Sequence, residues 1–99
     1  MFVVIARIKA REGEGDELED VFKELVEWVT ENEADTLTYT CSRSTSDRDQ
    51  FTFFERYTSQ KAFESHAGSE KFAELVGQIQ GRLAGPIEIE TYDEIAGKL

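Results

Sequence analysis

The spacing of apolar residues changes repeatedly along this chain, and the order of those changes limits the fold. A nearly continuous apolar run, Phe2–Lys9, is typical of a strand whose two faces are both covered. Helical spacing follows, from a predicted N-terminal cap at Asp16 to about Glu31. Two alternating runs, Thr36–Ser44 and Phe51–Tyr57, then predict a pair of strands joined by a short polar connection.

Signals for two successive helical segments follow the third predicted strand. Thr58–Ser59 and Gly68–Ser69 are typical helix starts, and the longer second segment carries apolar residues at helical spacing up to Leu83. Gly85–Pro86 should end it, because proline cannot continue a helix and glycine suits its C-terminal cap. Residues 87–92 alternate again and predict a last strand.

The resulting order, βαββαβ, predicts one α+β domain over residues 1–99 with a ferredoxin-like fold. In such a fold a four-stranded antiparallel sheet carries two helices on one face. Bulky apolar residues nevertheless occur on both faces of the strands Phe2–Ile8 and Phe51–Phe54. Since an exposed apolar patch of that size usually marks an interface, we expect a homodimer that forms through the open sheet face.

Composition excludes several classes of function. The formal net charge of −10 opposes binding to nucleic acid or to an anionic membrane, because such binding depends on basic side chains. The single cysteine, Cys41, cannot form an internal disulfide, and no Cys/His cluster has metal-ligand spacing. No stretch predicts a signal peptide or a membrane span, so a cytoplasmic protein is expected.

His66 and Glu55 are the candidate catalytic residues. Helical spacing puts His66, the only histidine, on the inward stripe of the short helical segment, and an imidazole suits proton transfer near neutral pH. Glu55 could orient His66 or accept a proton itself. The simpler alternatives are a helix-end histidine bonded to a backbone carbonyl, and a Glu55 ion pair with Arg56, Arg43 or Lys61.

Aromatic side chains near these two residues suggest a pocket for a flat ligand. Tyr39, Phe53, Tyr57 and Phe72 are the candidate substrate-binding residues, although large rings also fill the core of a small α+β domain by default. Strand alternation predicts that Leu37 shares the face of Tyr39. Such a pocket would suit a small aromatic substrate, and the sequence contains no metal-binding or cofactor-binding motif.

The segment FFERYTSQKAFESHAGSEKFAEL resembles the signature of the antibiotic biosynthesis monooxygenase family, which includes small quinol monooxygenases. The resemblance rests on Phe54, Glu55, Tyr57, Ala62, Phe63, His66, Ser69 and Phe72. It implies a dimeric α+β barrel with a pocket between helices and sheet that binds planar quinols or polycyclic phenols. It also implies oxygenation without metal or flavin, in which the protein positions the substrate and tunes one proton transfer.

Other activities of related proteins fit this sequence less well. Haem-degrading members resemble the chain in fold but depend on an Asn in the first strand and a Trp near the end of the third, and the chain has neither. Members that isomerise a phosphorylated sugar derivative need a phosphate site, and no basic cluster or glycine-rich loop occurs here. A non-catalytic dimeric module that binds a small aromatic ligand is the alternative from a different class.

Overall fold

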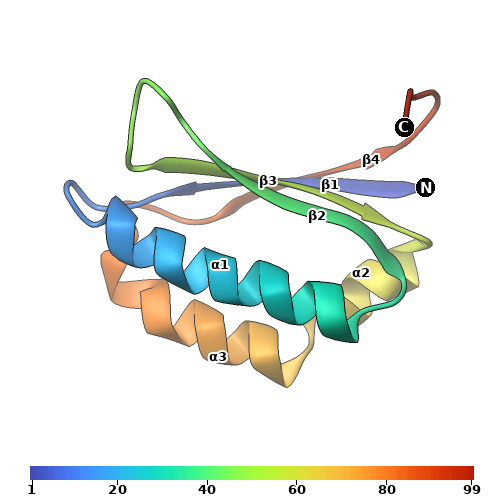
Figure 1. The fold of residues 1–99 in the computed structure, drawn as a ribbon, viewed down its shortest axis with the longest axis horizontal. Helices are drawn as coiled ribbons and strands as arrows, with labels where there is room; N and C mark the ends of the chain where they lie inside the picture. Colours follow the sequence, from blue (N-terminus) through green and yellow to red (C-terminus); the bar gives the residue numbers. More distant parts are fainter.

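The predicted ferredoxin-like fold is confirmed by a computed structural model that describes residues 1–99. Four antiparallel strands form one sheet in the order β2-β3-β1-β4, and the helices cover one of its faces (Figure 1). The elements in chain order are β1 (Phe2–Lys9), α1 (Gly15–Asn32), β2 (Thr36–Arg43), β3 (Gln50–Tyr57), α2 (Gln60–Ala67), α3 (Glu70–Ile79), the 3₁₀ turn η1 (Gln80–Arg82) and β4 (Glu88–Asp93).

Strand register separates the residues of the core from those of the open face. In the central pair β1 and β3, Ala6 lies opposite Phe53 and both are buried beneath the helices. One residue earlier on β1, Ile5 lies opposite Phe54 on the other face, where Phe54 is 39% exposed. The apolar stripe of α1 packs onto the inner face as predicted, through Leu18, Phe22, Leu25 and Val29.

The starts of α2 and α3 were predicted correctly, because the residue just before each helix supplies its cap. Ser59 accepts a hydrogen bond from the Ala62 amide at the start of α2, and Ser69 accepts one from the Phe72 amide at the start of α3. The prediction of Asp16 as the cap of α1 was wrong. The helix begins at Gly15, whose amide donates to Asp49 Oδ1 at 3.2 Å, so this cap comes from the β2–β3 loop.

Two further details differ from the sequence prediction. A β-bulge between Thr36 and Thr38 breaks the alternation of β2, and Leu37 is consequently 45% exposed instead of sharing the inner face with Tyr39. The longer helical segment also ends early. α3 stops at Ile79, η1 follows, and Leu83 instead forms an isolated β-bridge with Ala10.

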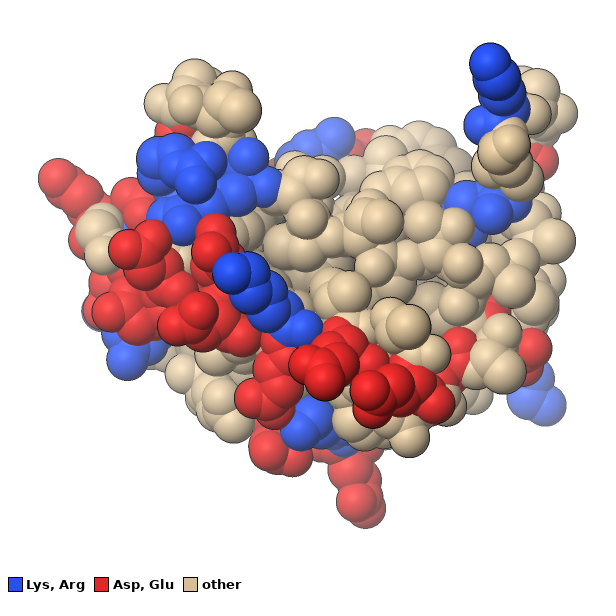
Figure 2. Space-filling model, in the orientation of Figure 1, with Lys and Arg blue, Asp and Glu red and all other residues tan.

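Charge is unevenly distributed over the surface. Acidic side chains gather over α1, whose exposed face carries Asp16, Glu17, Asp20, Glu24, Glu27 and Glu31 (Figure 2). The adjoining surface over β2 is mostly uncharged. None of the helices is both long and apolar enough to cross a membrane.

Candidate functional site

An apolar cavity of about 160 Å³ lies between the sheet and the helices. Of its 15 lining residues 13 are hydrophobic, and the two polar exceptions are Glu55 and His66. β3 supplies Glu55 and α2 supplies His66, and both side chains are buried. The two residues singled out for proton transfer therefore meet in one hollow, where they are the only groups able to exchange protons.

Glu55 keeps its proton to a higher pH than an ordinary glutamate. It faces Val4 of β1 and Tyr39 of β2, and the Tyr57 hydroxyl donates to its Oε1 at 2.5 Å. Burial raises the pKa of the carboxyl from 4.5 to about 7; the Tyr57 hydrogen bond lowers it, and the charge of Glu33 adds to the rise. None of the three alternative ion pairs of Glu55 forms: Arg56 binds Glu94, Arg43 binds Asp16 and Glu19, and Lys61 makes no ion pair with Glu55.

His66 is bonded to a carboxylate that the sequence analysis missed. Its Nδ1 lies 2.9 Å from both oxygens of Glu33, the C-cap residue just after α1, and not against a backbone carbonyl. No hydrogen bond joins His66 to Glu55. The helical period contained a usable signal, because Glu33 lies one turn after the buried Val29 and so continues the inward stripe.

Glu55 and His66 each have one polar side-chain atom that makes no hydrogen bond within the chain. Glu55 uses Oε1 and His66 uses Nδ1 in their hydrogen bonds, which leaves Oε2 and Nε2 without partners. No fully buried side-chain nitrogen or oxygen in the chain lacks a partner, so these two atoms are not fully enclosed. The only hollow that Glu55 lines is the apolar cavity, and a ligand hydroxyl there would find an acceptor.

The four predicted aromatic residues divide into two groups. Phe53 and Phe72 line the cavity, whereas Tyr39 and Tyr57 do not. The two tyrosines pack against the imidazole of His66, with ring centroids 4.9 Å and 5.8 Å away, and Phe72 packs against it at 5.0 Å. Burial raises the pKa of both tyrosine hydroxyls, so they stay protonated near neutral pH, and the Tyr57 hydroxyl donates to Glu55.

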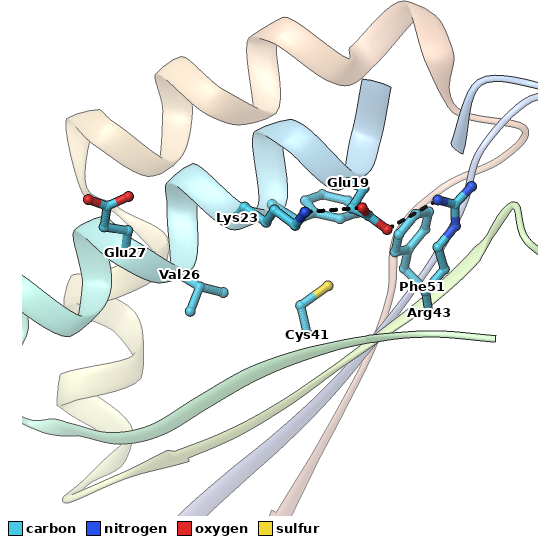
Figure 3. Close-up of a pocket in the computed structure, with 8 residues that line it drawn as sticks. Glu19, Lys23, Val26, Glu27, Cys41, Arg43 and Phe51 are labelled. Carbon is cyan, nitrogen blue, oxygen red and sulfur yellow. Dashed lines mark hydrogen bonds and ion pairs between the residues drawn. The ribbon is translucent and has the colours of Figure 1, made fainter. Parts of the chain in front are cut away.

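A larger hollow of about 470 Å³ lies between α1 and β2, and three of its four charged residues pair with one another, whereas Glu27 has no ion-pair partner (Figure 3). Glu19 bridges Lys23 at 3.2 Å and Arg43 at 3.1 Å. Burial raises the pKa of the Cys41 thiol to about 12, which leaves it protonated and unreactive. No group of three or more His, Cys, Asp or Glu side chains is arranged to hold a metal ion. The apolar cavity, which brings Glu55 and His66 together, is therefore the candidate site.

Solved structures with the same fold match this chain over nearly its whole length. One crystal structure is that of an antibiotic biosynthesis monooxygenase whose sequence is 26% identical to this chain. The two structures match with a TM-score of 0.88 over 97% of this chain and 100% of the other. A Caulobacter crescentus protein described as a candidate member of that family is 28% identical, with a TM-score of 0.90 over 96% and 90%. A Nitrosomonas europaea protein, 16% identical with a TM-score of 0.92 over 97% and 100%, supports the fold alone.

Sequence comparison gives the family directly. No curated protein is similar enough to count as a match. The sequence profile of the antibiotic biosynthesis monooxygenase family matches residues 1–78, which include β1, the whole of α1 and α2, and both candidate catalytic residues. The chain therefore belongs to the antibiotic biosynthesis monooxygenase family.

Proposed function

We propose that this protein is a cofactor-independent monooxygenase that oxidises a small quinol in the apolar cavity. The observation that carries the proposal is the isolation of Glu55 and His66 among apolar lining residues. Family membership and monooxygenase-named structural relatives support the same reaction class. A buried carboxyl with a pKa of about 7 suits proton transfer, because a catalytic base works best when its pKa lies near the working pH.

The proposed reaction needs only the quinol and dioxygen. Glu55 or His66 takes the proton of a quinol hydroxyl, and the resulting anion passes electrons to dioxygen. One oxygen atom then enters the ring and the other leaves as water, while the ring is oxidised to a hydroxyquinone; the substrate supplies all the electrons. The protein contributes positioning, water exclusion and proton transfer.

Cavity size favours a small substrate over a polycyclic phenol. A closed apolar cavity of about 150 Å³ accommodates benzene, and the cavity here measures about 160 Å³. A single-ring hydroquinone is therefore the best match. A polycyclic phenol would require α2 and α3 to move away from the sheet, since Phe63, Phe72 and Val76 of these helices form one wall.

Oxygen consumption tests the proposal. The purified protein would be mixed with single-ring, two-ring and three-ring hydroquinones in an oxygen electrode, with labelled dioxygen to distinguish oxygenation from simple oxidation to a quinone. We expect labelled hydroxyquinone from the smaller substrates, and at least a tenfold lower kcat for Glu55→Gln and for His66→Ala. Glu64→Gln, an exposed carboxylate change on α2, is the matched control and should behave like wild type.

The rival function is a non-catalytic module that binds an aromatic ligand in the same cavity. Tight ligand binding without oxygen consumption above the buffer rate would support the module and reject the monooxygenase for that panel. Turnover that is equal in wild type and His66→Ala would remove His66 from the mechanism and leave Glu55 as the base.

A further inference from the structure

His66 separates two hollows of opposite character. One is the apolar cavity, and the other is an open polar hollow of about 270 Å³ between the end of α1, the start of β2 and α2. His66 is the only residue that lines both. Glu33 lines the polar hollow but not the apolar cavity. The contact between His66 and Glu33 therefore joins the interior to the solvent side.

Glu33 is fixed from several directions. Its backbone amide donates to the Val29 carbonyl at 2.9 Å, and its own carbonyl accepts from the Thr36 amide at 3.2 Å. The Thr36 hydroxyl donates to Oε1 at 2.7 Å. With its side chain only 14% exposed, the carboxylate has little freedom to turn away from the imidazole. Glu33 is therefore a rigid partner for His66, not a mobile surface acid.

A carboxylate partner selects one form of a neutral imidazole. An ionised carboxylate has only acceptor atoms, so the Nδ1 that it contacts must carry the proton. The two ring nitrogens point in widely different directions, so Nε2 is turned away from Glu33. Glu33 lines only the polar hollow, and the other hollow that His66 lines is the apolar cavity, so we infer that Nε2 faces that cavity. Without Glu33, the neutral ring would be free to carry its proton on Nε2, where it would block proton acceptance.

We propose that Glu33 is a positioning residue for His66: it holds the imidazole in the form protonated at Nδ1, so that Nε2 faces the apolar cavity as a free proton acceptor. This inference rests on the proposed function. When a quinol is deprotonated, its O–H bond breaks, an N–H bond forms at Nε2, and the electron pair stays on the oxygen. The imidazolium then lies against the Glu33 carboxylate, whose polar hollow gives the proton a route to water.

The single histidine makes a direct test practicable. Long-range proton–nitrogen NMR spectra of wild type at alkaline pH should contain one imidazole with a protonated Nδ1 and an unprotonated Nε2. Glu33→Ala should shift the ring mainly to the form protonated at Nε2. Glu33→Gln retains an acceptor oxygen and should keep part of the wild-type signal, and it serves as the readout if Glu33→Ala fails to fold. Glu31→Gln, an exposed change near the same helix end, should have no effect.

A ligand readout that needs no turnover accompanies the spectra. para-Nitrophenol is a single-ring phenol that is coloured only when ionised, so its absorbance reports the proton transfer. Wild type and Glu31→Gln should increase its ionised fraction, and Glu33→Ala should abolish the increase. With a quinol substrate, Glu33→Ala should lower kcat about tenfold or more while KM changes less than about twofold, because the substrate does not touch Glu33.

The outcomes separate this inference from the proposed function. A wild-type ring protonated at Nε2, or a Glu33→Ala spectrum identical to wild type, would overturn the role of Glu33 whatever the enzyme does. The expected spectra and nitrophenol response without quinol oxidation would uphold Glu33 as the positioning residue and reject the monooxygenase reaction instead.

Discussion

Glu55 links the candidate site to the stability of the fold. Its pKa is about 7 in the folded protein and ordinarily 4.5, so between these values the folded chain binds a proton that the unfolded chain has lost. The free energy of unfolding therefore falls as pH rises through this window. The full shift corresponds to about 3 kcal/mol, and we expect much of that loss between about pH 5 and pH 8.

Glu55→Gln should remove this pH dependence. The amide cannot ionise, and its oxygen can still accept the Tyr57 hydroxyl, so the variant should be more stable than wild type at pH 8 by roughly 1–3 kcal/mol and similar at pH 5. Urea denaturation at both pH values measures the difference. Glu64→Gln supplies the exposed control, and a wild-type stability that stays flat over this range would contradict the high pKa of Glu55.

Residue by residue, the sequence was informative where one local pattern decides the outcome. Strand alternation put Glu55 on the same face as Phe53, and helical spacing put His66 on the inward stripe; both occur, and the structure adds that this strand face is the one beneath the helices. The partner of His66 was not predicted, since Glu33 sits at the end of an acidic helix in which most carboxylates are solvated. Its pairing depends on the approach of α2 to the end of α1, which no local pattern encodes.

The junction of α1 with the β2–β3 loop was likewise outside the reach of local patterns. Asp49 accepts hydrogen bonds from the amides of Gly13 and Gly15, so the loop does the capping that the sequence analysis assigned to Asp16. The two elements also touch. A Cβ atom at Gly15 would collide with the Arg43 guanidinium and come within 2.6 Å of the Arg48 carbonyl oxygen.

Two glycine-to-alanine changes should therefore have opposite effects. Gly15→Ala forces the start of α1 away from the backbone of the loop and should lower the free energy of unfolding by about 1–3 kcal/mol. Gly77→Ala, in α3, meets no atom within 4 Å and replaces a poor helix former, so it should raise stability by about 0.5–1 kcal/mol. Thermal or urea denaturation of both variants checks the pair, and a destabilised Gly77→Ala would show that α3 is not helical there.

At the level of the whole molecule, the sheet has one face that no helix covers. The helices all lie on the opposite side (Figure 1), and the open face carries Val3, Ile5, Phe54 and Tyr92 according to the strand register. Phe54 and Tyr92 are 39% and 43% exposed. The acidic side chains of α1 lie on the other side of the sheet from this face. Two copies could therefore pack through their open sheet faces while their acidic surfaces stay apart.

We therefore propose that the protein forms a homodimer through the open sheet face. Light scattering coupled to size exclusion at low micromolar concentration should give twice the chain mass of 11.3 kDa. Phe54→Glu introduces a charge at the centre of the face and should give a folded monomer, because burying unpaired carboxylates costs several kcal/mol. Gln78→Glu adds the same charge on exposed α3 and should remain dimeric. A wild-type monomer would refute the interface, and a dimeric Phe54→Glu with a normal fold would move it elsewhere on the surface.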